Sequence, residues 1–371
     1  MERRLARSVA VPVAAALAAT ALGGCFDGTV RTPTEAAKTV PAPQPNPRAH
    51  PSDQGISIAA VGDTMLGNTP ELPPEPATYL DPVAGELQGD VVFGNLEGTL
   101  TEVAESPKCE GAKPGSCYAF RAPPEYAGYL AGAGFTLMSN ANNHSADFGE
   151  AGLGETVEAL HAAGIEQTGL PGEITVVKAG GRRVAFVGFA PYAYTNSLTD
   201  LEAARVLIEE ADAEADLVVV AIHAGAEGSD AQHVSGAEEE YLGEDRGNAE
   251  EFAHLAIDAG ADLVLGSGPH VLRGIELYKH RLLAYSLGNF CGFHNFATEG
   301  ALGESVVLHL TLAPGGAFRS GRLASLRLVE AGQPVPDPSG EAAATIAALS
   351  AEDFGSSAIQ VAPDGRLEAH S

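Results

Sequence analysis

The sequence predicts an α/β protein in which a mixed β-sheet is covered by helices on both faces. From residue 56 onward, strand-like and helix-like segments alternate along the chain. Several strand segments are continuously apolar, as in DLVVVAIH at 216–223, and this is typical of strands that are buried on both faces. Paired strand segments late in the chain, such as those within 274–290, indicate hairpins. The sheet is therefore expected to be mixed rather than purely parallel.

The predicted elements follow one another in a regular order. Strands are expected at 56–63, 90–95, 135–140, 182–191, 216–223 and 261–268, in the hairpin 274–290, and in two late antiparallel strands at 304–313 and 321–330. Helices are expected at 123–134, 149–164 and 199–215. The second helix places Leu153, Val157 and Leu160 on one face. In the third, Thr199 is the expected cap and Glu202 follows three residues later.

Length and charge limit the possible domain organisation and partners. The chain has 371 residues and a formal net charge of −28, and this length suits either about two domains or one large α/β unit. We expect a folded domain over 55–330 and a C-terminal extension, 331–371, with a short helix. Nucleic acid is not an expected partner, because so acidic a chain has little with which to neutralise phosphates.

The N-terminal segment has the features of an export signal. A basic start with Arg3, Arg4 and Arg7 precedes an apolar stretch that ends in Leu22-Gly23-Gly24-Cys25. This ending resembles a bacterial lipobox, in which the cysteine becomes a lipid-carrying N-terminus; the alternative is an ordinary secretory signal. Residues 26–54 are rich in Pro, Thr and Ala, which predicts a disordered tether. We therefore expect an extracytoplasmic protein anchored to the cell membrane by lipid on Cys25.

An extracytoplasmic location also determines the oxidation state that we expect for the other three cysteines. Cys109 and Cys117 flank a loop rich in Gly, Pro and Ser and could form a disulfide outside the cytoplasm. A metal pair is the alternative, although no His or second Cys pair flanks them. Cys291 is expected to be buried and free.

Polar side chains recur where the predicted strands end. They are Asp63, Asn95, Glu97, Asn142, Asn143, His144, Asp147, His223, Glu227, Asp230, His233, His270 and Asn289. Each one alone would more often be a turn or cap residue. Together they indicate a ligand site, because the carboxyl ends of strands in α/β sheets are where such sites assemble. Carboxylate, amide and imidazole groups predict one or two divalent ions, with Mn, Zn or Fe preferred.

Several sequence blocks resemble those of the capsule-synthesis protein A (CapA) family. The blocks are AAVGDTMLG, VFGNLEGTLT, SNANNHSADFG, AIHAGAEGSD, GSGPHVLRGIE and LLAYSLGNF, within about residues 56–312. This family is linked to poly-γ-glutamate capsules and belongs to the calcineurin-like metallophosphoesterase superfamily. The resemblance implies a four-layer αββα sandwich with two mixed β-sheets.

The resemblance also implies roles for individual residues. The metal ligands would be Asp63, Glu97, Asn143, His223 and His270, with Glu97 bridging two ions. His144 would be the catalytic acid that protonates the leaving oxygen.

Two positions depart from the superfamily pattern. Met65 and Gly268 stand where histidine ligands are expected, so each of the two implied metal sites lacks one nitrogen. The following residues could complete the ligand set or contact substrate: Asn95, Asn142, Asp147, Glu227, Asp230, His233 and Asn289. Alternatively, one of the sites is weak or empty.

Three functions are compatible with these features. The first is a metal-dependent hydrolase of a phosphoester, or of an amide in a polymer such as poly-γ-glutamate. The second is a non-catalytic, lipid-anchored part of a polymer export or attachment complex, with other capsule-synthesis membrane proteins as partners, that binds an anionic polymer through metal. The third is a solute-binding lipoprotein. Arg121, Arg273 and Arg281 are candidates for contacting an anionic polymer.

Overall fold

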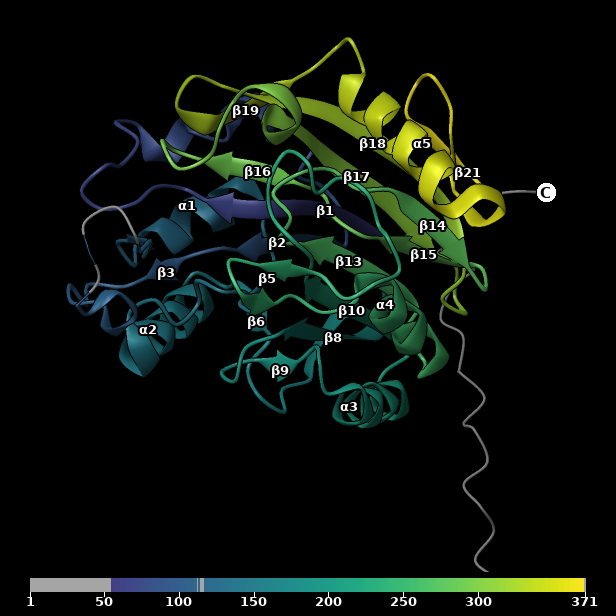
Figure 1. Ribbon diagram of the computed structural model, residues 1–371, viewed down its shortest axis with the longest axis horizontal. Coiled ribbons are helices and arrows are strands. Elements are labelled where there is room, and N and C mark those ends of the chain that lie inside the picture. Colours follow the sequence, from purple (N-terminus) through teal and green to yellow (C-terminus); the bar gives the residue numbers. More distant parts are fainter. Residues whose placement is uncertain (1–54, 112, 114–116, 370–371) are drawn as a thin grey trace, which may run out of the picture. The chain divides into compact units, whose positions relative to one another are not determined.

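Two mixed β-sheets form the centre of the fold (Figure 1). The computed structural model describes residues 55–111, 113 and 117–369. The predicted signal segment, Cys25 and the tether lie outside these residues. Among the described helices, none has both the length and the apolar character needed to cross a membrane.

The first sheet has ten strands in the order β20-β21-β18-β17-β1-β2-β5-β6, with β16 paired to β1 and β19 paired to β18. Their bounds are β1 Ile56–Met65, β2 Val91–Leu96, β5 Leu137–Ser139, β6 Glu166–Thr168, β16 Asn289–Gly292, β17 Glu304–Leu312, β18 Phe318–Val329, β19 Gln333–Pro336, β20 Gln360–Val361 and β21 Arg366–Glu368.

The second sheet has seven strands in the order β14-β15-β13-β10-β8-β7, with β9 paired to β8. Their bounds are β7 Thr175–Ala179, β8 Arg182–Ala190, β9 Asn196–Ser197, β10 Leu217–His223, β13 Leu263–Ser267, β14 Ile275–Tyr278 and β15 Arg281–Ala284. Two small two-stranded sheets pair β3 (Thr99–Leu100) with β4 (Arg121–Ala122) and β11 (Glu240–Tyr241) with β12 (Glu244–Asp245).

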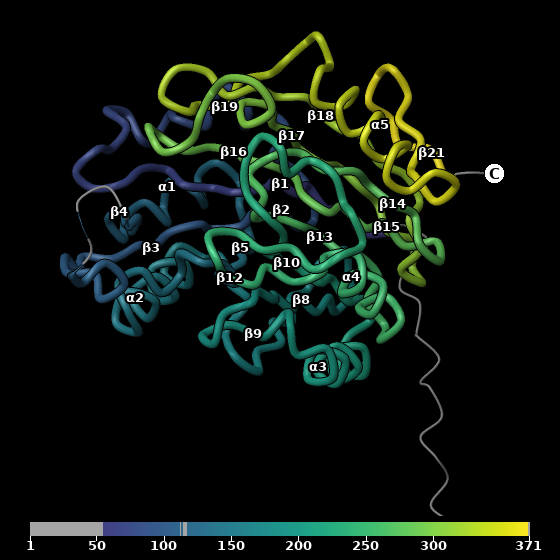
Figure 2. Tube along the Cα trace, viewed as in Figure 1, coloured from purple at the N-terminus to yellow at the C-terminus, as the bar shows by residue number. Residues whose placement is uncertain are grey.

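Apolar side chains between and outside the sheets create four layers. Phe93 of the first sheet stacks on Phe186 of the second, with ring centroids 6.1 Å apart, inside a core to which both sheets contribute. The outer face of the first sheet packs against α1 (Tyr126–Ala133) and α2 (Gly149–Ala162). The outer face of the second packs against α3 (Leu201–Glu214) and α4 (Ala249–Asp258), as the chain trace in Figure 2 shows. The predicted αββα order is thus present.

The C-terminal segment is part of the first sheet rather than an appendage. Strands β19 and β21 both pair with β18. Helix α5 (Glu341–Phe354) buries Ile346 in the core between the two sheets. Residues beyond 330 therefore complete the sandwich.

Three local predictions differ from the structure. The cap of α3 is Asp200, not Thr199, because the Asp200 carboxylate accepts the Ala203 N–H at 3.1 Å. Helix α4 was not predicted, although Asn248 caps it by accepting the Glu251 N–H at 3.1 Å. Asn289 begins a strand instead of ending one, since the hairpin stops at Ala284 and β16 turns back to pair in parallel with β1.

The cysteines lie as follows. Cys109 and Cys117 form a disulfide with Cα atoms 5.6 Å apart. Cys291 is buried and free.

Strand register places the polar strand ends together. Asp63 at the end of β1 pairs with Asn95 of β2 on one side and with Asn289 of β16 on the other. In the second sheet His223 pairs with Ser267. Asp63 and Asn95 lie near the carboxyl ends of β1 and β2, and β16 begins beside them with Asn289, so these residues lie at one edge of the first sheet.

Candidate metal centre

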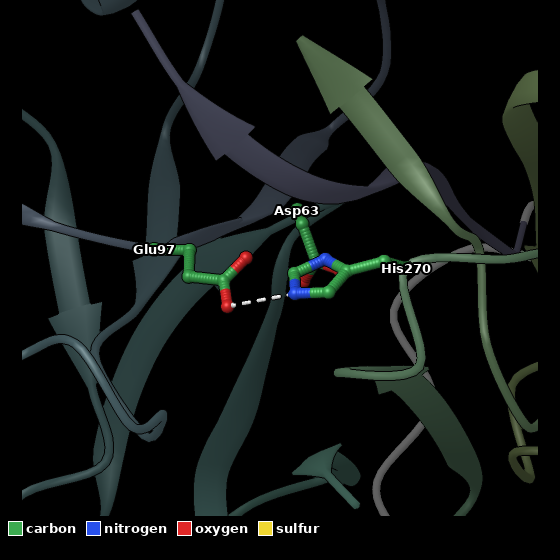
Figure 3. A group of neighbouring side chains, drawn as sticks. All are labelled: Asp63, Glu97 and His270. Carbon is green, nitrogen blue, oxygen red and sulfur yellow. Dashed lines mark ion pairs between the residues drawn. The ribbon is translucent and has the colours of Figure 1, made fainter. Parts of the chain in front are cut away.

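Asp63, Glu97 and His270 converge on one point and are called the carboxylate cluster below (Figure 3). Each offers a ligand atom, and these atoms all lie within 4.8 Å of one another. Asp63 comes from β1, Glu97 directly follows β2, and His270 lies in the loop after β13. The two sheets therefore both contribute to the cluster.

Glu97 is the most unusual member of this cluster. It is fully buried, yet neither carboxylate oxygen accepts a hydrogen bond from any residue in the described part of the chain. Burial, together with the negative charges of Asp63 and Glu227, holds the pKa of Glu97 well above its usual range, although His270 and Arg246 oppose this shift. A buried carboxylate without donors is costly, so Glu97 needs a cation to satisfy it.

His270 is surrounded by carboxylates. Its Nδ1 atom lies 3.1 Å from Asp63 Oδ2, and its Nε2 atom lies 3.5 Å from Glu97 Oε1 and 3.7 Å from Glu227 Oε2. Burial opposes the charged form, but Glu97 and Asp63 raise the pKa of His270 to about 10. A positive charge is thus favoured at this position, and either an imidazolium or a bound cation can supply it.

The surroundings fix how His270 is oriented. Asn289 Oδ1 lies 3.0 Å from His270 Nδ1, which favours a proton on Nδ1 and leaves Nε2 as the nitrogen available to a metal. His270 also has a φ of 62°, a left-handed conformation that is uncommon for residues other than glycine and that often marks functional sites.

Asn95 and Asn142 support the cluster with their amide groups. Asn95 Nδ2 donates to Asp63 Oδ1 at 2.8 Å, and Asn142 Nδ2 donates to Asn95 Oδ1 at 3.1 Å. The Asn142 oxygen in turn accepts the backbone N–H of His144 at 3.0 Å. These contacts orient Asp63 and place His144, so neither amide is free to serve as a ligand.

The available donors fit a divalent cation. Asp63, Glu97 and His270 offer oxygen and nitrogen ligands of the kind that Mn, Zn and Fe accept. Asn143 adds a buried side-chain oxygen that has no partner among residues 55–369 as far as these are described. Two orphaned oxygens on Glu97 and one on Asn143 are what a site built to hold a cation would show.

His144 belongs to a second functional group beside the cluster. Its Nδ1 atom lies 2.8 Å from Asp147 Oδ2, and Asp147 Oδ1 accepts from Lys108 Nζ at 2.6 Å. Lys108 Nζ also donates to the Asn143 carbonyl at 3.0 Å. Burial lowers the pKa of His144, while the Asp147 carboxylate opposes this shift. Asp147, a candidate ligand from its sequence position, instead orients His144.

A pocket of about 580 Å³ connects these groups. Its wall includes Glu97, Lys108, Tyr118, Phe120, Asn143, His144, Glu227, Arg246, His270, Asn289, Asn295 and Phe296. A hollow of similar volume, about 600 Å³, lies against α3 and is lined by other residues. The pocket that joins the carboxylate cluster to His144 is therefore the candidate active site.

Comparison with known proteins identifies the family. Residues 57–293 match the model of the bacterial capsule synthesis protein PGA_cap. The chain belongs to this family. The resemblance to CapA that the sequence blocks indicate is thereby confirmed.

Two relatives carry names from capsule and PGA biosynthesis. The chain is 28% identical over 270 residues to the capsule biosynthesis protein CapA of Bacillus anthracis, covering 66% of this chain and 61% of that protein. It is 28% identical over 262 residues to the PGA biosynthesis protein CapA of Bacillus subtilis (strain 168), covering 64% of each. The chain therefore spans just over three fifths of the length of these relatives.

Two solved structures show a limited similarity to this chain. A 5'-nucleotidase precursor from Thermus thermophilus matches with a TM-score of 0.40 and 14% identity, over 80% of this chain and 58% of that one. A purple acid phosphatase from yellow lupin seeds matches with a TM-score of 0.38 and 12% identity, over 75% and 52%.

Arg246 was not among the predicted site residues, yet it lines the pocket. Arg246, between β12 and α4, is only 1% exposed. Its Nη1 atom donates to Glu227 Oε1 at 2.7 Å, and its Nη2 atom lies 3.2 Å from His223 Nε2. We call His223, Glu227 and Arg246 the arginine cluster. Lys108, in the short turn Pro107–Cys109, was not predicted either. Arg246 follows β12, a two-residue strand that the apolar pattern does not predict, so neither residue lies at the end of a predicted strand.

His223 is buried but is engaged by Arg246. Because a guanidinium only donates, His223 Nε2 accepts this hydrogen bond. Burial and the Arg246 charge hold the pKa of His223 well below its usual range, so the ring is neutral. His223 Nε2 lies 4.0 Å from Glu97, near the carboxylate cluster, but its lone pair faces the guanidinium.

The structure places two candidate ligands away from the pocket. His233 Nδ1 lies 2.7 Å from Asp353 of α5, and Asp230 is exposed next to Ser229. In the loop after β10, Glu227 and Gly228 line the pocket, whereas Asp230 and His233 do not. Sequence proximity to His223 was therefore misleading for both residues.

The three arginines that were candidates for contacting a polymer have structural partners. Arg273 is fully buried and donates to both oxygens of Glu239 at 2.8 and 2.7 Å. Arg281 donates to Asp262 at 3.1 Å, and Arg121 stacks over Phe148 at 5.8 Å. The basic groups on the pocket wall are Lys108 and Arg246.

Proposed function

We propose that this PGA_cap family member is a metal-dependent hydrolase that cleaves a phosphoester or amide bond in an anionic substrate of capsular poly-γ-glutamate synthesis, export or processing. The observation that carries the proposal is the buried Glu97 carboxylate. It groups with Asp63 and His270, and it lines with His270 the pocket that also presents His144. A structural carboxylate would accept hydrogen bonds, whereas Glu97 accepts none from the described residues and its shortest ion pair, with His270, is 3.5 Å long.

The proposed roles follow from the contacts. Asp63, Glu97 and His270 would hold the ion, and the Asn143 oxygen is the nearest further candidate. A divalent ion in such a site supplies a Lewis acid that polarises a phosphoryl or carbonyl oxygen. His144 is held at Nδ1 by Asp147, and in its imidazolium form it would donate the Nε2 proton to the leaving atom and become neutral. Lys108 and Arg246 supply positive charge for an anionic substrate.

The alternative is a non-catalytic protein that holds an anionic polymer through its metal. The paired His144 and Asp147 favour catalysis, because an oriented proton donor is not needed for binding alone. The names of the Bacillus relatives, and of a probable polyglutamine synthesis accessory protein from Mycobacterium tuberculosis that is 30% identical over 266 residues, support a polyglutamate substrate.

A substrate panel tests this proposal. The full chain is stripped with a chelator, reloaded with Mn or Zn, and assayed on phosphoesters and on γ-linked polyglutamate. We expect turnover that requires metal and is lost in the chelator. Bound metal and bound polymer without turnover would instead identify the non-catalytic component.

We also propose that the protein is lipid-anchored outside the cytoplasm through Cys25. A Cys25→Ser change should release the protein into the medium, since residues 26–54 contain no apolar stretch able to hold a bilayer. Retention of this variant in membranes after a high-salt wash would contradict the anchor.

A further inference from the structure

Arg246 occupies the space beside Glu97 where a second ligand set would have to form. Its guanidinium lies between His223, at 3.2 Å, and Glu227, at 2.7 Å. The Tyr192 hydroxyl accepts a further bond from Nη1 at 3.2 Å. The Arg246 side chain is buried and contacts His223 and Glu227, the two residues that a second ion would need as ligands.

The backbone holds Arg246 in this position. Its N–H donates to the Glu239 carbonyl at 2.8 Å, and its carbonyl accepts the Gly225 N–H at 3.0 Å. Glu239 is itself clamped by the buried Arg273. Two residues later Asn248 caps α4. The guanidinium is therefore supported by rigid structure on both sides.

Gly268 offers no side-chain nitrogen at the position where the superfamily pattern has a histidine, and its surroundings leave little room for one. Its φ is +111°, a conformation that other residues rarely adopt. A Cβ atom added to Gly268 would lie 3.1 Å from the backbone nitrogen of Ala224 and 3.2 Å from His223 Nε2. A histidine at this position would crowd the ring that already faces Arg246.

We infer that the centre holds one divalent ion, on Asp63, Glu97 and His270, and that the guanidinium of Arg246 supplies a fixed positive charge where a second ion would stand. This inference rests on the proposed function for the presence of an ion. It adds that His223 accepts from Arg246 instead of binding metal. The pocket then contains two positive charges: an exchangeable metal ion and the guanidinium of Arg246.

Metal stoichiometry tests the inference without an activity assay. The full chain and its variants are equilibrated with excess Mn or Zn, desalted, and analysed for metal per chain. We expect one ion in the wild type, one in His223→Ala and none in His270→Ala. His254→Ala is the matched control, because His254 is bonded to Glu276 instead, and it should retain one ion.

Two ions in the wild type, or loss of the bound ion in His223→Ala, would overturn the inference. Two ions would leave the proposed hydrolase intact, whereas no ion in the wild type would contradict both. The metal count of an Arg246→Gln variant provides a further test. Removing the guanidinium should free His223 and Glu227 to bind a second ion. A count that rises above one supports the inference, and a folded variant that stays at one contradicts the role given to Arg246. If this variant does not fold, the wild-type and His223→Ala counts decide.

Discussion

The carboxylate cluster and the arginine cluster border the same pocket and differ in how their charges are balanced. In the arginine cluster the guanidinium donates to both partners, at 2.7 Å and 3.2 Å. In the carboxylate cluster the two Glu97 oxygens receive no hydrogen bond within the described ranges. Glu227 touches both clusters, since its other oxygen lies 3.7 Å from His270. The comparison indicates that the Arg246 guanidinium balances the charge in the arginine cluster, whereas the carboxylate cluster is left for a bound metal ion.

Replacing Glu97 should have the largest effect on the difference between the two clusters, because it removes the carboxylate left for the ion. In Glu97→Gln, metal content and turnover should both fall to background, because a neutral amide is a poor substitute for a carboxylate ligand. The metal-free variant should nevertheless be more stable than the metal-free wild type, by about 1 kcal/mol, since a buried carboxyl group that accepts no hydrogen bond has been replaced by a neutral amide. Urea unfolding in a chelator measures this difference.

Retained metal in Glu97→Gln would show that the carboxylate cluster does not bind the ion. A variant that binds no metal and is also less stable in chelator would mean that Glu97 has a structural partner after all.

His144 should separate proton donation from metal binding. In His144→Ala we expect turnover to fall by about 10²–10⁴-fold, which is the usual contribution of a general acid, while the metal content remains that of the wild type. Single-turnover kinetics and elemental analysis of the same preparation provide both values. Metal loss as large as that in Glu97→Gln would contradict the assigned role.

Asn289 should have the smallest effect, on affinity rather than stoichiometry. Because Asn289 Oδ1 orients His270 at 3.0 Å, Asn289→Ala should weaken metal binding by about 10–100-fold without changing the count at saturation. Asn295→Ala is the matched control: Asn295 also lines the pocket but donates to the Phe293 carbonyl. Titration with a metal indicator measures both. Equal affinities in the two variants would mean that Asn289 does not position His270.

Much of the fold could be predicted because the apolar pattern of each strand is local. Continuous apolar runs such as 216–223 become strands buried between layers. Helix α4 escaped prediction although its signals were present: Asn248 as cap, Glu251 three residues later, and apolar Phe252 and Ala256 one turn apart. The pairing of β16 with β1 could not be predicted, because strand partners depend on the path of the whole chain.

The site could be predicted only where backbone position decides it. Parallel strands bring Asp63 and Glu97 to the same edge, so their strand-end positions were informative. Arg246 extends a long side chain from a loop into the pocket. The position of such a side chain leaves no periodic pattern in the sequence from which it could be predicted. His233 illustrates the opposite error, since it follows a site strand in sequence but pairs with Asp353 in space.

The most direct test of the central claim is a crystal structure of the metal-loaded protein with anomalous diffraction measured at the metal edge. The account predicts one anomalous peak, about 2.0–2.3 Å from ligand atoms of Asp63, Glu97 and His270, with the Arg246 guanidinium still against His223. A second peak coordinated by His223, or a peak outside the carboxylate cluster, would contradict it.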